Sequence, residues 1–224
     1  AFKAVKTSGL TSVATKGKDI AVVCTEKKVT DLLIDPSSVS NIYNITDTIG
    51  ALTTGITPDA KAIISRLRME AADYKFENGH TIPIDILSQR WADLAQLYTQ
   101  KMFMRPLGVE TMLVSIDDER GSQIYKIDPS GHFLGYKACT AGIKEVEASN
   151  YLAKQFKKKE DLHTTYSDNE TIQLAIGTLQ NVLSTDFKST DIEVGIISRR
   201  EKKFRKLTPL EIEEHLNALS SKDQ

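Results

Sequence analysis

The sequence predicts an α+β fold in which antiparallel sheets carry helices on their outer faces. Strand-like and helix-like segments follow one another in the order strands, two helices, strands, two helices, strand and helix. Such segregated runs favour antiparallel sheets with helices packed outside, whereas a parallel sheet needs strands and helices in alternation. The segments between neighbouring strands are short and rich in turn residues. The apolar fraction of 40% in 224 residues is enough for a conventional core.

The first part of the chain contains two predicted hairpins. The β-prone runs 11–15 and 20–24 flank a short polar turn that contains glycine and aspartate. Two further runs, 42–45 and 48–52, are separated by only two residues, which is typical of a tight hairpin. We therefore expect an antiparallel sheet at the start of the fold.

Two long helices are predicted to follow these strands. Thr57 supplies a capping hydroxyl and Pro58 suits the first helical position. An apolar stripe at helical spacing follows, and Gly79 ends the helix. The second helix begins near Pro83 and ends before Pro106, because proline cannot continue a helix. Its apolar side is expected to carry Leu87, Trp91, Leu94, Tyr98 and Met102.

The second half of the chain returns to strands and then to helices. Strands are predicted at 111–116, 123–127 and 133–138, with strong turn signals between them. Helical periodicity resumes at 148–156 and again at 172–183.

The end of the chain contributes one more strand and one more helix. The polar stretch 157–169 is expected to be an exposed connection between the two helices that flank it. A β-like run covers 192–197. Thr208 and Glu211 form a capping-box pattern that predicts a short final helix.

Charge and composition exclude several classes of protein. The 29 basic and 30 acidic residues give a net charge of −1, so no whole-molecule field attracts nucleic acid or an anionic membrane. No apolar run is long enough to span a bilayer and no charged-then-apolar leader opens the chain, so we expect a soluble, non-secreted protein. Cys24 and Cys139 lie in apolar β-like runs, where buried and inert thiols are expected. The chain begins at Ala1, and we expect residues to precede it.

Common catalytic and metal-binding motifs are missing from the sequence. It has no HExxH, no paired CxxC, no Walker loop and no GxSxG, so metal-hydrolase, zinc-module, NTPase and α/β-hydrolase functions have no motif to support them. No cofactor is expected. We expect ordinary surface or packing histidines and no metal site, because no spacing places two of the four on one face. These residues are His80, His132, His163 and His215.

Two basic runs leave a nucleic-acid function open. They cover 154–159 and 199–206, and the second has six positive groups in eight residues. It suits a nuclear-import patch or a nucleic-acid contact. A solvated hairpin turn between Ile197 and Leu207 is the favoured interpretation, because Phe204 is the only aromatic residue available for stacking within the run.

Several short motifs together point to one family. They occur in order over nearly the whole chain, and their combination is specific although each alone is weak. They comprise residues 54–60, 98–100, 105–109, 128–131 and 136–138, together with Arg66, Glu70 and Tyr74. In this combination the chain resembles the α subunits of the 20S proteasome. Residues 33–40 and 104–109 look most like the eukaryotic iota-type subunit, which occupies the first α-ring position.

The resemblance implies a fold and a missing reaction. The implied fold is a single domain over residues 1–224, a four-layer αββα sandwich of the N-terminal-nucleophile hydrolase fold. In active β relatives, a threonine exposed by cleavage after glycine supplies both the nucleophile and the amine base. Leu10 stands at that position after Gly9, so the resemblance implies a non-catalytic subunit. Glu26 matches the acidic position, and we expect a structural or surface role for it.

The lysine of the β active site is matched by Asn41. Most α subunits of the resembled family also carry a lysine there, which binds the C-terminal carboxylate of activator proteins. Asparagine can hydrogen-bond a carboxylate but brings no charge. The resemblance therefore implies a weak activator pocket at Asn41. It also implies that the chain keeps only the last turn of the family's first helix and lacks the gating segment before it.

The implied role is assembly. Expected partners are neighbouring α subunits, β-ring subunits and regulatory or activator particles, with neither membrane nor nucleic acid among them, in the cytoplasm and nucleus. Two alternatives stay open. One is a stand-alone N-terminal-nucleophile amidohydrolase that uses Ser8 or Thr11 exposed by processing. The other is a nucleic-acid-binding module that uses residues 199–206.

Overall fold

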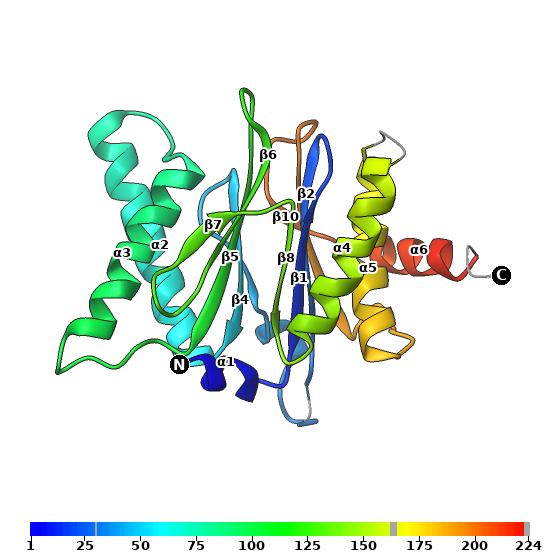
Figure 1. Ribbon diagram of the computed structural model, residues 1–224, viewed down its shortest axis with the longest axis horizontal. Helices are drawn as coiled ribbons and strands as arrows, with labels where there is room; N and C mark the ends of the chain where they lie inside the picture. The colour runs from blue at the N-terminus through cyan, green and yellow to red at the C-terminus, as the bar shows by residue number, and fades with distance from the viewer. Residues whose placement is uncertain (30, 162–164, 222–224) are drawn as a thin grey trace.

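Two antiparallel five-stranded sheets pack face to face between two helical layers in the computed structural model (Figure 1). The structure describes residues 1–29, 31–161 and 165–221. One sheet, sheet A, has the order β10-β9-β2-β1-β8, and the other, sheet B, has the order β3-β4-β5-β6-β7. The helices α2 and α3 cover sheet B, and α4 and α5 cover sheet A (Figure 1). The predicted α+β sandwich of two antiparallel sheets is confirmed.

Sheet A joins strands from the two ends of the chain. The antiparallel hairpin predicted near the start consists of β1 and β2, and Val13 pairs with Cys24 in its register. The late strand β9 adds to the outer side of β2, and β8 adds to the other side of β1. The strands of sheet A are β1 (Thr11–Lys16), β2 (Ile20–Glu26), β8 (Ala138–Gly142), β9 (Ile192–Ser198) and β10 (Arg205–Lys206).

Sheet B is a meander of neighbours in sequence. Each strand pairs with the next, from Ile42 opposite Leu52 to Ile127 opposite Phe133. Its strands are β3 (Ile42–Asn44), β4 (Ile49–Gly55), β5 (Val109–Asp117), β6 (Gly121–Ile127) and β7 (Phe133–Gly135). The helices are α1 (Phe2–Thr7), α2 (Thr57–Asn78), α3 (Ile84–Gln100), α4 (Glu145–Asp161), α5 (Asp168–Leu183) and α6 (Pro209–Ser220), with a 3₁₀ turn at Pro36–Ser38.

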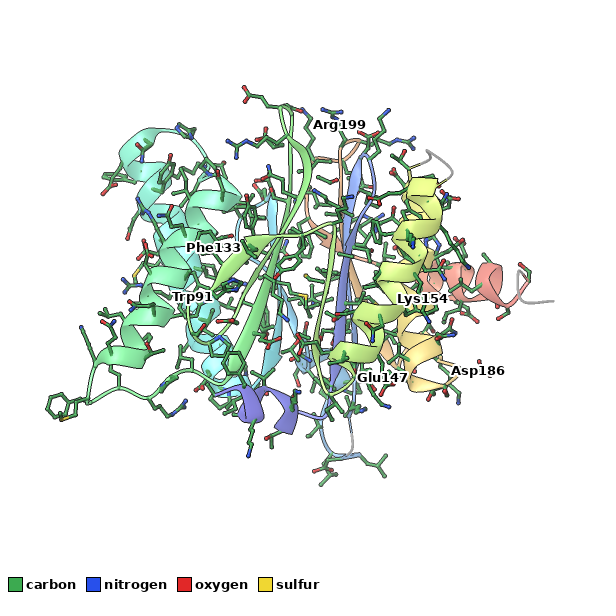
Figure 2. All side chains as sticks on the ribbon, viewed as in Figure 1. Trp91, Phe133, Glu147, Lys154, Asp186 and Arg199 are labelled. Carbon is green, nitrogen blue, oxygen red and sulfur yellow. The ribbon has the colours of Figure 1, made fainter. Side chains whose placement is uncertain are left out.

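Three apolar layers hold the sandwich together, and side chains fill the spaces between its elements (Figure 2). One layer lies between α2, α3 and sheet B and includes Trp91. A second lies between sheet A and the helices α4, α5 and α6. The third lies between the two sheets and contains Phe204, which is 1% exposed. A Cβ atom at Gly50 or at Gly195 would collide with the Phe204 ring, so both glycines make room for it.

The predicted strand 133–138 is wrong in one respect, because it is two strands in different sheets. Phe133 pairs with Ile127 in sheet B, whereas Ala138 pairs with Thr15 in sheet A. The chain crosses between the sheets at Tyr136 and Lys137. Both residues hold their place by backbone hydrogen bonds, Tyr136 N–H to Ile124 O at 2.9 Å and Lys16 N–H to Lys137 O at 3.1 Å.

Three helix ends differ from prediction. The helix α4 continues through 157–161, because lysine and glutamate are good helix formers and the polarity of this stretch does not indicate a loop. The rest of the predicted connection includes 162–164, which lie outside the described residues. Ile56 occupies the cap position of α2, and the Thr57 side chain makes no capping bond. Met102 lies beyond the end of α3 and is 93% exposed.

Other predictions of local structure are confirmed. Thr208 and Glu211 make both hydrogen bonds of the capping box at the start of α6. Cys24 and Cys139 are buried free thiols. Burial raises the pKa of the Cys139 thiol to about 12, which leaves it protonated and inert.

We predict that Phe204→Ala lowers the free energy of unfolding by about 3–5 kcal/mol, because it removes a buried ring that the surrounding sheets cannot replace. Denaturant unfolding of the purified chain measures this. Phe76→Ala is the matched control, since Phe76 is 92% exposed and its removal should change stability by less than about 0.5 kcal/mol. Equal losses for the two variants would contradict the assigned inter-sheet core.

Candidate functional site

The position of the expected nucleophile lies between α1 and β1, at one end of the sandwich. Leu10 occupies it, and its backbone carbonyl accepts a hydrogen bond from Ile143 N–H at 3.2 Å. Gly142 has a φ of 101°, and a Cβ atom there would collide with the Leu10 carbonyl oxygen. The close approach of these two backbone segments holds the Leu10 backbone in place. Its aliphatic side chain offers no atom that can attack a carbonyl.

Glu26 is structural, and it lies beside this position. The carboxylate is 5% exposed, and its Oε2 accepts a hydrogen bond from Thr11 N–H at 2.8 Å. Its other oxygen pairs with Lys28 Nζ at 2.9 Å, and the same Nζ donates to Gly9 O at 2.8 Å. The carboxylate of Glu26 thus bonds the amide of the residue that follows Leu10. The carboxylate is occupied in holding the backbone of residues 9–11.

Thr11 does not fit the role of a displaced nucleophile. Successive side chains of a strand point to opposite faces, and the neighbouring Ser12 faces sheet B. Thr11 therefore faces the helical layer of α4 and α5, as do Val13 and Thr15 of the same strand. Its hydroxyl is buried and has no hydrogen-bond partner among the described residues. No described residue therefore acts as a base that could activate the Thr11 hydroxyl.

A row of buried hydroxyls joins the two sheets behind Leu10. Thr54 of β4 donates to Ser12 Oγ at 2.7 Å, and Ser12 lies 2.8 Å from Thr25 Oγ1 of β2. The inter-sheet layer is apolar further along and becomes polar here. Each of these three hydroxyls has a hydrogen-bond partner within the chain.

The helix α1 covers this end of the sandwich. It packs against the ends of β4 and β5, as Figure 1 shows at the foot of the molecule. Val5 is 1% exposed, and a Cβ atom at Gly108 would lie 3.0 Å from Ala4 Cβ. The opening between the sheets is thus filled by side chains of the chain's own first helix.

Asn41 lies apart from Leu10, at the start of β3. Its backbone N–H donates to Glu193 Oε2 at 3.2 Å, and its carbonyl accepts from Thr53 N–H at 3.0 Å. Glu193 is 9% exposed and lies 3.8 Å from Lys27 Nζ and 3.7 Å from Lys206 Nζ. The lysines near Asn41 are therefore already paired with a carboxylate of the same chain.

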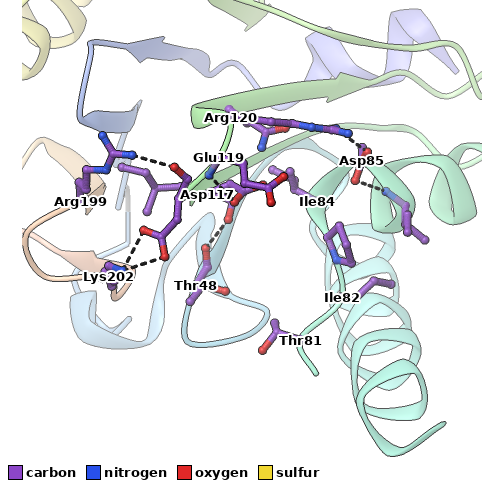
Figure 3. A pocket seen from close by; sticks show the side chains of 16 residues that line it. Thr48, Thr81, Ile82, Ile84, Asp85, Asp117, Glu119, Arg120, Arg199 and Lys202 are labelled. Atoms are coloured by element: carbon purple, nitrogen blue, oxygen red, sulfur yellow. Dashed lines mark hydrogen bonds and ion pairs between the residues drawn. The ribbon is translucent and has the colours of Figure 1, made fainter. Parts of the chain in front are cut away.

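The basic run 199–206 forms the predicted turn between β9 and β10. Four of its six cations are paired within the chain. Lys202 Nζ lies 2.8 Å from Asp118, and Arg199 lies 3.2 Å from Asp19. Figure 3 labels Lys202 and Arg199. Arg205 pairs with two glutamates, and Lys206 pairs with Glu193. The Phe204 ring, expected to be available for stacking, is buried between the sheets instead.

The turn borders a hollow of about 500 Å³ at the end of the sandwich opposite α1 (Figure 3). Its charged rim is largely self-paired, since Arg120 also pairs with Asp85 at 2.8 Å. No group of histidine, cysteine or carboxylate side chains in the described part of the chain is arranged to hold a metal ion. His163 lies outside the described residues. Among the described helices, none is long and apolar enough to cross a membrane.

Comparison with known proteins assigns this arrangement to a family. The family model described as "Proteasome subunit" matches residues 5–197. The chain belongs to the proteasome subunit family. It is 45% identical over 223 residues to the probable proteasome subunit alpha type-1 of Schizosaccharomyces pombe, covering 100% of this chain and 90% of that protein.

Two further relatives support the α-type assignment. The proteasome subunit alpha type-6 of Caenorhabditis elegans is 41% identical over 223 residues, covering 100% of this chain and 89% of that protein. The proteasome subunit alpha of Thermococcus sibiricus is 34% identical over 212 residues, covering 95% of this chain and 78% of that protein. The chain is therefore a proteasome subunit of the α type.

Two of the motifs that carried the resemblance meet in space, which their separation in sequence did not reveal. Asp59, in the first turn of α2, accepts two hydrogen bonds from the Arg105 guanidinium, both at 2.7 Å. It also accepts one from Gly108 N–H at 3.0 Å. The Arg105 hydrogen bonds hold the pKa of the Asp59 carboxyl below its usual range. This clamp ties α2 to the loop that enters β5, beside α1.

A second buried network was also missed. Lys126 of β6 lies 3.1 Å from Glu110 and 2.5 Å from Glu145, and it donates to Thr140 O at 2.8 Å. Burial raises the pKa of Glu110, which faces Lys126 within this group. The network links sheet B to β8 and to the start of α4. The sequence does not indicate this network, because Glu110 and Lys126 stand in different strands and no local pattern connects them.

We predict that Asp59→Asn lowers the free energy of unfolding by about 2 kcal/mol near neutral pH, because it weakens the charge-assisted hydrogen bonds that the buried Asp59 carboxylate accepts from the exposed Arg105 and from Gly108 N–H. The folded-state pKa of Asp59 is depressed, so its contribution is complete above the unfolded value of about 3.9 and is lost as pH falls through the folded value. The difference from wild type should therefore shrink below about pH 4.

Denaturant titrations at several pH values test this prediction. Asp93→Asn is the control, because Asp93 is an exposed aspartate on α3. A loss for Asp59→Asn that stays constant down to acid pH would show that the pair has no electrostatic role.

Proposed function

We propose that this chain is a non-catalytic structural subunit of the α ring of the 20S proteasome core, acting in ubiquitin-dependent protein degradation. The observation that carries the proposal is the end of the sandwich at Leu10. There an aliphatic residue inside a continuous chain stands where a terminal hydroxyl residue would act, and α1 fills the opening.

The lack of catalysis follows from chemistry that this end cannot supply. An N-terminal nucleophile needs a hydroxyl or thiol group together with a free amine base. Leu10 supplies no hydroxyl, and the peptide bond to Gly9 leaves no amine. Glu26 is engaged with Thr11 N–H and Lys28. The retained fold would therefore serve assembly.

Within the ring, we place the chain at the first, iota-type position. Residues 33–40 and 104–109 support this. We expect one domain over residues 1–224 and a location in the cytoplasm and nucleus.

Exposed apolar side chains are consistent with partners on several sides. Leu32 and Leu33 project from the loop after β2, and Met102 and Phe103 project from the end of α3, all more than nine-tenths exposed. Large apolar side chains in such numbers are typical of obligate interfaces. We propose neighbouring α subunits, the β ring and activator particles as the partners.

The stand-alone amidohydrolase alternative has little to support it. The Ser8 hydroxyl donates to Val5 O at 3.0 Å within the last turn of α1, and Thr11 is buried on the wrong face. Affinity purification of the tagged chain from its source, followed by identification of the bound proteins, tests the proposal. A full set of other α-type and β-type subunits is expected, and recovery of the chain alone would contradict it.

We predict that an electrophile directed at N-terminal threonine does not label this chain, and that Leu10→Thr does not create labelling. The reason is that residues 8–11 remain continuous and Glu26 stays bound to Thr11 N–H. Intact-mass measurement after treatment checks both. Active β subunits in the same preparation are the positive control. A labelled wild-type chain that begins at Ser8 or Thr11 would favour the amidohydrolase.

We predict that the pocket at Asn41 binds an activator C-terminal carboxylate weakly, because Asn41 adds no charge and the nearby Lys27 and Lys206 are both engaged with Glu193. Asn41→Lys should strengthen binding of a C-terminal activator peptide to assembled particles by about tenfold. Asn150→Lys adds the same charge on the exposed side of α4 and should change nothing. An unchanged affinity for Asn41→Lys would oppose the pocket assignment.

A further inference from the structure

A second hollow, of about 200 Å³, lies where the end of α4 meets the β1–β2 turn and the residues before α5. We call it the basic hollow. Two aromatic rings, Phe156 and Tyr166, form its apolar floor. Four lysines border it, namely Lys16, Lys18, Lys137 and Lys159. It lies on the helical side of sheet A, away from Leu10 and the end that α1 covers, so the proposed role in the ring does not explain it.

The floor of the basic hollow is preformed. The Phe156 and Tyr166 rings meet edge to face, with centroids 5.3 Å apart and planes at 65°. Phe156 is anchored in the apolar layer between sheet A and its helices, and both rings remain partly exposed. A Cβ atom at Gly17 would collide with the Thr171 side chain, so the β1–β2 turn approaches α5 closely. A ligand would therefore find the rings already in place.

The rim of the basic hollow carries more positive than negative charge. Lys137 pairs with Glu160, and Lys159 lies 3.2 Å from Glu170 and 4.9 Å from the Tyr166 ring centroid. Lys16 donates to a backbone carbonyl, that of Ser122, at 3.2 Å. Burial, and then the nearby charge of Lys137, lowers the pKa of Lys16. Among the described side chains, these four lysines thus face two carboxylates, Glu160 and Glu170.

The helix α4 carries further positive charge beside the basic hollow. Lys154, Lys157 and Lys158 are exposed residues of α4, and Figure 2 labels Lys154 on that helix. They belong to the basic run 154–159, which the proposed function leaves without a role. Positive charge around a small apolar hollow is complementary to a ligand that is apolar at its centre and anionic at its edges.

We propose that the basic hollow docks an acidic peptide segment of a partner protein. One large apolar side chain of the segment enters between Phe156 and Tyr166, and its flanking carboxylates pair with Lys18 and Lys137. The apolar floor favours this ligand over a free phosphate, which would need hydrogen-bond donors there. The hollow is also too small for successive stacked bases, which favours a peptide over nucleic acid.

Fluorescence anisotropy with the full chain, alone and in purified particles, tests this proposal. The probe is a labelled peptide of aspartates and glutamates with one central phenylalanine. The matched peptide has serine at the centre and should bind at least about tenfold more weakly, because a phenylalanine ring gains from burial. Binding should also weaken as salt rises. Equal affinity of the two peptides would overturn the proposal, since it would indicate attraction by charge alone.

Charge-reversal variants and cross-linking locate the binding. Lys18→Glu combined with Lys137→Glu should lower the affinity for the phenylalanine peptide by about tenfold. Lys61→Glu, on exposed α2 at the other side of the sandwich, is the control and should have no effect. A peptide with photoreactive benzoylphenylalanine at its centre should label the segments that contain Phe156 and Tyr166. Labelling elsewhere, or tighter binding of single-stranded DNA than of the peptide through the same lysines, would overturn the proposal.

Discussion

The packing of two five-stranded sheets against each other is the constraint on which the rest of this structure depends. Along most of their length the sheets meet through apolar side chains, with Phe204 fitted against two glycines. At one end the contact becomes polar, through the Ser12, Thr25 and Thr54 hydroxyls. These hydroxyls bond one another, and α1 packs beside them against the ends of β4 and β5.

The closed end explains how a hydrolase fold becomes a component of an assembly. Glu26 and Lys28 hold the backbone of residues 9–11, and Asp59 and Arg105 hold the loop beside α1. Each of these carboxylates is buried and fully engaged, so each stabilises a fixed backbone and is not free for proton transfer. The most exposed of the described apolar residues lie on loops at the outside of the sandwich, namely Leu32, Leu33, Met102 and Phe103. The architecture thus separates a rigid interior from surfaces that suit partners.

Local signals in the sequence were sufficient for most elements. The first hairpin, the two helices on sheet B and the capping box of α6 follow from periodicity and turn chemistry, which act over a few residues. The single strand expected at 133–138 could not be divided, because both halves are β-prone and only pairing with β6 or β1 distinguishes them. The end of α4 was mistaken for a loop because its lysines are polar, although lysine is a good helix former.

The site could be predicted in outline, and its contacts could not. The match of Leu10 and Glu26 to family positions followed from the motifs, and the structure adds that Glu26 bonds the amide of Thr11, the residue after Leu10. The bond from Thr11 N–H to Glu26, the Asp59–Arg105 clamp and the Lys126 network join residues that lie between 14 and 46 positions apart. No local pattern encodes such pairs, since they depend on how the sheets and helices pack.

Hydrogen exchange at the Thr11 amide tests the central claim most directly. This N–H belongs to the residue that follows Leu10, and it donates to a carboxylate that is 5% exposed. If the end of the sandwich is closed as described, the amide will exchange as slowly as those in the centre of β1 and β2. Exchange as fast as in the exposed loop after β2 would mean that this end opens readily, which would contradict the account of a sealed, inert fold.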